Sequence, residues 1–140
     1  MIVIVYVQYS SALVSDHEDV AGVKLNHLNL AVTDVGAAKA FLETYFGLTA
    51  TPGVGDDERF VLLRDDADMA VTLMRGAAGA EVAYPGTFHI GFVQPSEQAV
   101  DAINERMAHD GHDVPPPRHF HGSWTFYAKA PGGFAVEVMC

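Results

Sequence analysis

The chain has 140 residues, which fits one compact domain with a core of its own. Its formal net charge is −10 and its eight Lys and Arg residues form no basic stripe, so the composition argues against a nucleic-acid partner. The single cysteine, Cys140, excludes an internal disulfide and a cysteine zinc cluster. A reducing, cytoplasmic setting is therefore the default expectation.

The first 22 residues are predicted to form a separate N-terminal strand and connector. The opening MIVIVYVQY is apolar, but it is far shorter than the roughly 20 residues that span a bilayer. No basic residue precedes it, so neither a signal peptide nor a membrane anchor is expected. Its Ile, Val and Tyr content predicts an extra strand, and residues 10–22 read as a polar connector. The remainder, residues 23–140, is predicted to be one domain.

The first half of that domain begins with a strand and a helix. Residues 24–33 alternate between two kinds of side chain, which predicts a strand with His27 on one side and the apolar residues on the other. Asp34 is a suitable N-cap for a helix that ends at Phe46, and Gly47 fits its C-terminal stop. Three more strands are predicted at about 48–53, 59–64 and 69–75.

The second half repeats this order after a link rich in Gly and Ala at residues 76–86. A strand at 87–94 is followed by Ser96 as N-cap of a helix that Gly111 ends. Further strands are predicted near 112–114 and at 124–129 and 134–139, while Pro115 to Pro117 must form a loop or an edge. The pattern is therefore α+β, with a βαβββ module over residues 23–76 and a second over residues 86–140.

The two modules are in register with each other. His27 and His89 are 62 positions apart (89 − 27), and so are the two helix N-caps Asp34 and Ser96 (96 − 34). A duplicated module that starts each copy with a strand histidine is able to bring two imidazoles to one place. Imidazole is a common metal ligand, so the repeat predicts a metal site.

Glu137 supplies a third candidate ligand. It lies in a predicted strand between apolar residues, where an unpaired carboxylate costs several kcal/mol or becomes protonated. A cation on the same face removes that cost. His27, His89 and Glu137 together form a two-histidine, one-carboxylate set that leaves coordination positions open. Such a set accepts Fe(II), Mn(II), Zn(II), Co(II) or Ni(II), and the residues alone do not select among them.

Three stretches resemble the vicinal oxygen chelate superfamily, the group of glyoxalases, bleomycin-resistance proteins and extradiol dioxygenases. They are HLNLAVTDVGAAKAFLETYFGL, FHIGF and FYAKAPGGFAVEV, and the resemblance runs from about Leu25 to Met139. It implies two βαβββ modules that make a half-open mixed β-barrel around one divalent metal, with ligands at His27, His89 and Glu137. It also implies a small-molecule substrate and a homodimer, with the metal site either within one chain or shared between subunits.

The resemblance leaves the subfamily open. Glyoxalase I adds a Glu or Gln ligand near the end of the first module, but the matching segment MAVTLMR (residues 69–75) has neither, which argues against that isomerase. Fosfomycin thiol transferases use a three-ligand set like this one and also need a basic pocket for a phosphonate. Thr125 and Tyr127 match hydroxyl positions of that pocket, but Arg118 is a weak replacement for its lysine. A metal-dependent lyase or transferase is the nearest enzymatic alternative.

Extradiol ring-cleavage dioxygenases match best around the last two strands. Their pattern of a His, a Tyr, Pro-x-Gly and the ligand Glu falls on His121, Tyr127, Pro131 and Glu137, with the expected Tyr-to-Glu interval of ten (137 − 127). The resemblance implies Fe(II), a catechol-type diol as substrate, His121 as proton acceptor and Tyr127 as hydrogen-bond donor to a developing oxyanion. The family's second catalytic histidine has no counterpart, since Met74 lies about where it is expected.

A non-catalytic reading stays open beside the enzymatic ones. Bleomycin-resistance proteins are acidic dimers that sequester a cationic antibiotic, and a net charge of −10 fits that use. Those proteins usually lack the metal ligands, whereas this chain has all three. Metal content after purification without chelator separates the two hypotheses.

Overall fold

The computed structural model describes residues 22–78 and 80–140, so the strand predicted at the start of the chain lies outside the described residues. The elements of the first module are β1 (His27–Val32), α2 (Val35–Phe46), β2 (Thr49–Ala50), β3 (Phe60–Arg64) and β4 (Ala70–Arg75). Those of the second are β5 (Ile90–Val93), α3 (Glu97–His109), β6 (Arg118–Phe120), β7 (Ser123–Lys129) and β8 (Ala135–Met139).

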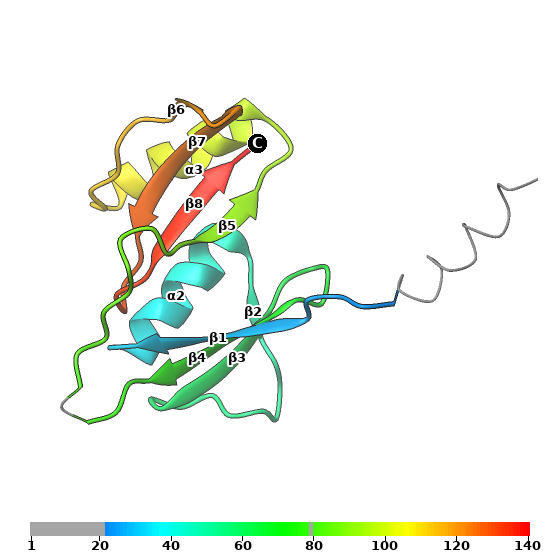
Figure 1. Cartoon of the computed structure of the whole chain (residues 1–140), viewed down its shortest axis with the longest axis vertical. Coiled ribbons are helices and arrows are strands. Elements are labelled where there is room, and N and C mark those ends of the chain that lie inside the picture. The colour runs from blue at the N-terminus through cyan, green and yellow to red at the C-terminus, as the bar shows by residue number, and fades with distance from the viewer. Residues whose placement is uncertain (1–21, 79) are drawn as a thin grey trace, which may run out of the picture.

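The two modules have the same topology. The strand order is β1-β4-β3-β2 in the first sheet and β5-β8-β7-β6 in the second (Figure 1). In each sheet the first strand of the module pairs in parallel with the last, and the remaining pairs are antiparallel. This confirms the predicted α+β fold of two βαβββ modules. In this topology β1 and β5 are edge strands. The predicted ligand His27 begins β1, and the predicted ligand His89 directly precedes β5.

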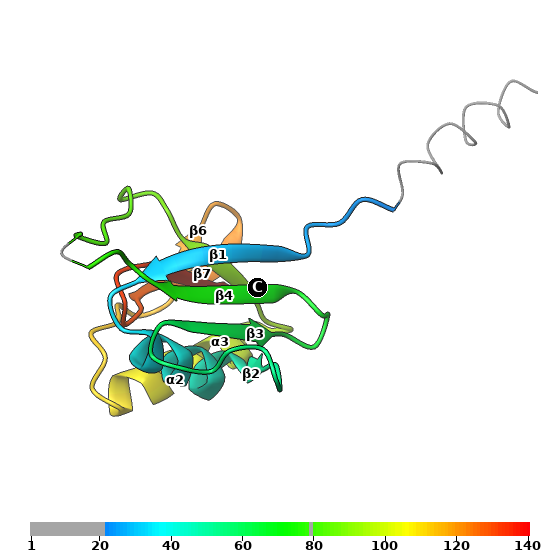
Figure 2. The same ribbon diagram turned by 90° about the horizontal axis from the view of Figure 1, so that it is seen from below.

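The helices form where the capping residues predict them. The side chain of Asp34 accepts a hydrogen bond from the Ala37 N–H, and Gly47 takes the left-handed conformation at φ 67° that ends α2. The Ser96 hydroxyl accepts a hydrogen bond from the Ala99 N–H at the start of α3. Each helix packs on one face of its own sheet, and Figure 2 shows both helices on the same side of the molecule. None of the described helices is both long and apolar enough to cross a membrane.

Each sheet therefore has a covered face and an open face. In β1 the side chains of Leu30 and Val32 are buried in the core, while those of His27, Asn29 and Ala31 point the other way and are exposed. The strand registers extend this alternation across both sheets. We call the side away from the helix the open face. Its members on the second sheet are His89, Gly91, Val93, Arg118, Phe120, Ser123, Thr125, Tyr127, Lys129, Ala135, Glu137 and Met139.

The two modules share one core and meet at the turn between β7 and β8. The carbonyl of Gly132 accepts a hydrogen bond from the Thr33 N–H just after β1. At φ 105°, Gly132 lies so close to Val32 that an added Cβ would come within 2.9 Å of the Val32 Cβ. The rings of Phe46 and Phe92 stack across the same joint with centroids 3.8 Å apart. The relative position of the modules is therefore set by close packing.

One predicted strand is wrong. Residues 112–114 form no strand, and the second strand of the second module is β6 (Arg118–Phe120), after the prolines. Residues 112–117 run as a loop, which the Asn104 side chain fastens by donating a hydrogen bond to the Pro115 carbonyl. Prolines have no N–H for a sheet ladder, so pairing begins only beyond them. The strand predicted at 48–53 is also shorter than expected, at Thr49–Ala50.

Candidate metal centre

Two of the three predicted ligands meet on the open face of the second sheet. Nε2 of His89 lies 3.2 Å from Oε2 of Glu137. The residue opposite Glu137 on β5 is Gly91, and His89 precedes it by two positions on the same face. The Glu137 side chain is 13% exposed and that of His89 is 37% exposed. The carboxylate is therefore largely shielded from solvent, while the imidazole is partly open to it.

The other ring nitrogen of His89 is also engaged. Nδ1 lies 3.0 Å from the carbonyl oxygen of Thr87, which favours the tautomer in which Nδ1 carries the proton and donates it. Nε2 then keeps its lone pair and points toward Glu137. Backbone carbonyls commonly orient metal-binding histidines in this way. The contact therefore presents the imidazole in the form that a metal requires.

Thr125 holds the other oxygen of Glu137, a role that the sequence interpretation did not assign. Its side chain is completely buried, and its hydroxyl donates toward Oε1 of Glu137 at 3.0 Å, with the Val138 carbonyl also within 2.9 Å. One oxygen of the carboxylate is thus hydrogen-bonded within the fold, and the other faces His89. The feature of the sequence that points to this contact is the alternation of side chains along β7 and β8. It puts Thr125, Tyr127 and Glu137 on the same face of the sheet.

Tyr127 is the direct neighbour of Glu137 on β7. Its ring packs edge-on against the His89 ring with centroids 5.3 Å apart. Hydrogen bonding to the Glu137 carboxylate raises the pKa of the Tyr127 phenol, and burial raises it further. The phenol therefore stays protonated at neutral pH and is available as a donor.

An open pocket of about 330 Å³ lies beside this group. Its lining residues are Gly86, Thr87, Phe88, His89, Phe120, His121, Tyr127 and Ala135. His121 occupies the two-residue turn between β6 and β7, where it adopts a left-handed φ of 49° ahead of Gly122 at φ 85°. Such a conformation is uncommon for a residue with a Cβ. The structure thus brings His121 and Tyr127 to the same pocket as His89.

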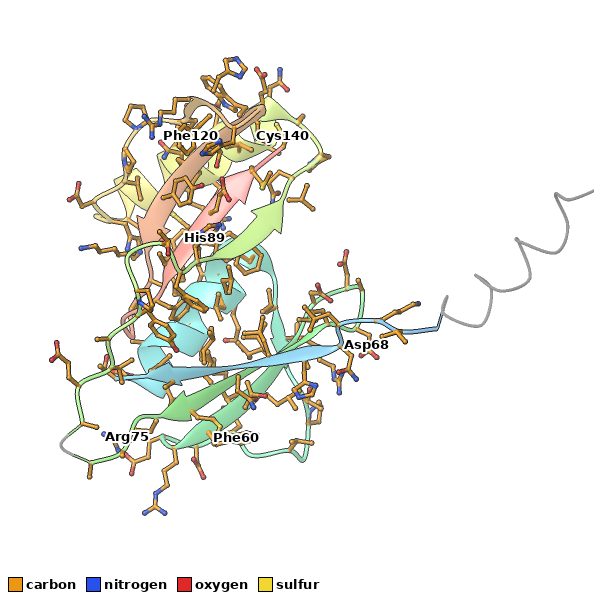
Figure 3. The ribbon with its side chains drawn as sticks, viewed as in Figure 1. Phe60, Asp68, Arg75, His89, Phe120 and Cys140 are labelled. Atoms are coloured by element: carbon orange, nitrogen blue, oxygen red, sulfur yellow. The ribbon has the colours of Figure 1, made fainter. Side chains whose placement is uncertain are left out.

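His27 does not join the pair within one chain. It begins β1 opposite Ala70, and its Nδ1 lies 2.7 Å from Oδ1 of Asn26. In Figure 3 the label of Asp68, just before β4, marks the end of the first sheet at which β1 begins. That end lies away from the label of His89 in this view. Within residues 22–78 and 80–140, no three His, Cys, Asp or Glu side chains converge closely enough to hold a metal.

The residues that do converge are chemically suited to a divalent ion. A histidine Nε2 and a carboxylate oxygen are ligands that Zn(II), Fe(II), Mn(II), Co(II) and Ni(II) all accept. Each also has a hydrogen-bond partner that fixes its orientation, namely Thr87 for His89 and Thr125 for Glu137. The pair therefore fits two positions of a metal site and leaves the third ligand to come from elsewhere.

Comparison with known proteins agrees with this fold. Residues 24–138 match the model of the Glyoxalase/Bleomycin resistance protein/Dioxygenase superfamily. The solved structure of a possible glyoxalase from Bacillus cereus is 50% identical, with a TM-score of 0.77, and the match covers 85% of this chain and 100% of that one. A comparison with the curated proteins finds no match.

Two more distant structures share the fold. A lactoylglutathione lyase from Agrobacterium tumefaciens is 21% identical, with a TM-score of 0.65, over 83% of this chain and 92% of that one. The fosfomycin resistance protein FosX from Mesorhizobium loti is 23% identical, with a TM-score of 0.64, over 83% and 90%. Because the family model spans most of the chain, this protein belongs to the glyoxalase/bleomycin resistance protein/dioxygenase superfamily.

Proposed function

We propose that the chain is a metal-dependent enzyme that acts on a small chelating diol, with extradiol ring cleavage of a catechol as the favoured reaction. The observation that carries this proposal is the approach of His89 to Glu137 at 3.2 Å, beside a pocket lined by Tyr127 and His121. A divalent ion held there would bind two neighbouring oxygens of the ligand and lower their pKa values. Fe(II) is the favoured ion, and the expected setting is the cytoplasm.

The third ligand in this proposal is His27 of a second copy of the chain. Each copy presents His27 on the open face of its first sheet and the His89–Glu137 pair on that of its second. In a two-fold symmetric dimer, the first sheet of one copy can face the second sheet of the other, which would complete two equivalent sites.

Exposed apolar side chains on the open faces support such a dimer. Met74 is 45% exposed on the first sheet, and Phe120 and Val93 are 37% and 80% exposed on the second. Exposed apolar side chains on the face of a sheet are suited to an interface with another chain. Both β1 and β5 are also edge strands of their sheets.

His121 and Tyr127 act on the substrate in this proposal. His121 lies in a turn at the pocket rim, where a neutral imidazole would accept a proton from the incoming diol and return it later. The Tyr127 phenol would donate a hydrogen bond to the oxygen on which negative charge develops. Both assignments rest on the position of these side chains in the pocket that His89 lines.

The first sheet supports a reaction that uses three protein ligands. The residues of β4 that share the open face with His27 are Ala70, Thr72 and Met74. None has a carboxylate or an amide, so this strand offers no fourth ligand of the kind that the glyoxalase I isomerase uses. An open coordination position is what a chelating substrate requires.

The test is anaerobic reconstitution with each of Fe(II), Mn(II), Zn(II), Co(II) and Ni(II), followed by oxygen uptake against a panel of catechols. Oxygen consumption with Fe(II) that is lost in both His89→Ala and Glu137→Ala supports the proposal. Protein that holds stoichiometric iron yet consumes no oxygen with any catechol contradicts the ring-cleavage reaction while retaining the metal site.

A further inference from the structure

The charges in the sheets run against the charge of the whole chain. The sequence has 18 acidic and eight basic residues. Yet among the strand residues of the described chain, Glu137 is the only acidic one, whereas four are basic: Arg64, Arg75, Arg118 and Lys129. The remaining described acidic residues lie in helices and loops. Within the strands, basic side chains therefore outnumber acidic ones, although the net charge of the chain is −10.

Two of these cations have no counter-ion among the described residues. Arg64 forms an ion pair with Asp68, and Arg75 lies 3.8 Å from Glu58. In contrast, the side chains of Arg118 and Lys129 make no ion pair or hydrogen bond with any other residue of 22–78 or 80–140. Both belong to the open face of the second sheet, where Glu137 is the one carboxylate. A divalent ion bound to Glu137 would more than neutralise that carboxylate and leave this face strongly cationic.

Arg118 is not part of the pocket lining itself, but it lies against Phe120, which is. It lies opposite Thr125, the residue that holds Glu137. Its guanidinium lies over the Phe120 ring at 4.7 Å from the centroid, and Phe120 lines the pocket with His89 and Tyr127. Stacking on an aromatic face keeps a guanidinium oriented while its N–H groups remain available. An arginine held in this way is suited to bind a planar carboxylate or a phosphonate through two hydrogen bonds.

We propose that the substrate is a small anion whose carboxylate or phosphonate is bound by Arg118 at the rim of the pocket, while its reactive oxygens face His89 and Glu137. This names a substrate class for the function proposed above and rests on it. The same charge distribution disfavours a cationic antibiotic as the occupant, despite the acidity of the chain. A cation would meet Arg118 and the metal at the place where it would have to bind.

The test measures binding by calorimetry, without oxygen, on full-length protein loaded with Zn(II). The probes are 3,4-dihydroxybenzoate, its uncharged methyl ester, catechol, benzoate and phenylphosphonate. Wild-type protein is expected to bind the dihydroxybenzoate about 10- to 100-fold more tightly than the ester, which is the range for a charge-assisted hydrogen bond. Benzoate and phenylphosphonate distinguish a preference for a carboxylate from one for a phosphonate.

Three variants isolate Arg118. In Arg118→Gln the acid-to-ester preference should fall to near one, while ester affinity and zinc content stay unchanged. Arg118→Lys keeps the charge and should keep part of the preference. Arg59→Gln removes the same charge from the first module, where the Arg59 side chain makes no ion pair with described residues, and should keep all of it. If each variant melts at the wild-type temperature, misfolding does not explain the result.

The outcomes separate the two proposals. Equal binding of acid and ester by wild-type protein, or a preference that survives Arg118→Gln, overturns the anionic substrate class. Zinc-dependent binding of catechol in the same experiment would still support the proposed function. If benzoate binds through Arg118 but no catechol binds in a zinc-dependent way, the anion site stands and the diol reaction fails.

Discussion

His89 and Glu137 meet at 3.2 Å although 48 positions separate them in the chain (137 − 89). They do so because β5 and β8 are parallel neighbours, and their register puts both side chains on the open face. The duplicated module predicts the corresponding position for His27 on β1, beside β4. A single chain therefore brings two of the proposed ligands together on its second sheet and presents the third on its first.

Glu137→Gln is expected to abolish stoichiometric metal binding. The amide keeps the size of the side chain but has lost the negative charge, and metal affinity should fall by more than the roughly 10- to 100-fold that loss of an outer hydrogen bond costs. Metal content by elemental analysis after purification without chelator measures this. Glu97→Gln, at the start of α3, is the matched control and should keep full metal content. Equal metal content in the two variants would rule out Glu137 as a ligand.

Thr125→Val is expected to weaken metal binding about 10-fold without unfolding the protein. The valine fills the same volume, but the hydroxyl that donates to Oε1 of Glu137 is gone, so the carboxylate loses its fixed orientation. Competition with a fluorescent zinc chelator measures the change. Thr51→Val, which removes a buried hydroxyl that makes no hydrogen bond with described residues, serves as control. Unchanged zinc affinity in Thr125→Val would show that this hydrogen bond does not support the site.

Gly132→Ala should destabilise the joint between the modules. Its φ of 105° is strained for alanine, and the new Cβ would lie 2.9 Å from the Cβ of Val32. Gly111 has a similar φ of 91°, but no atom of the described residues lies within 4 Å of an added Cβ, so Gly111→Ala isolates the backbone strain. We expect Gly132→Ala to cost about 1–3 kcal/mol more than Gly111→Ala in urea unfolding. An equal loss of unfolding free energy in the two variants would show that the close contact between Gly132 and Val32 does not contribute to stability.

The contact between Tyr45 and Asp110 should make stability depend on alkaline pH. Burial and the hydrogen bond to Asp110 raise the pKa of the Tyr45 phenol to about 12 from 10.0. Because the folded protein keeps this proton where the unfolded chain releases it, the contribution is full below pH 10 and is lost as pH rises toward 12. Tyr45→Phe should cost about 1 kcal/mol at pH 8 and show a shallower loss of stability above pH 10. Parallel curves for both proteins would contradict this.

The sequence was sufficient to predict those parts of the fold that depend on local signals. Asp34, Ser96 and Gly47 cap or end the helices as predicted, and the alternation in β1 separates buried Leu30 from exposed His27. The strand near 112–114 was mispredicted because the side chain of Asn104 holds this segment as a loop, through its hydrogen bond to the Pro115 carbonyl. That contact joins residues 11 positions apart and leaves no periodic pattern.

The candidate ligands could be chosen from the sequence, but which of them meet within one chain could not. The repeat predicted His27 and His89 as ligands, and the apolar strand around Glu137 predicted the carboxylate. The strand register then explains the contact between His89 and Glu137. The hydrogen bond from Thr125 to Glu137 was not predicted, because it depends on how the two side chains are oriented across β7 and β8. The position of His27 relative to the pair depends on how the two modules pack, and that packing is set by contacts such as Gly132 against Val32.

The most direct test of the account is the metal content of a heterodimer formed from His27→Ala and Glu137→Ala chains that carry different affinity tags. Each variant alone should hold no metal. In the heterodimer, His27 of one chain and the intact His89–Glu137 pair of the other would restore one of the two sites, so we predict about one metal ion per heterodimer. A pure heterodimer that holds no metal would contradict the proposal that the three ligands converge between two copies of this chain.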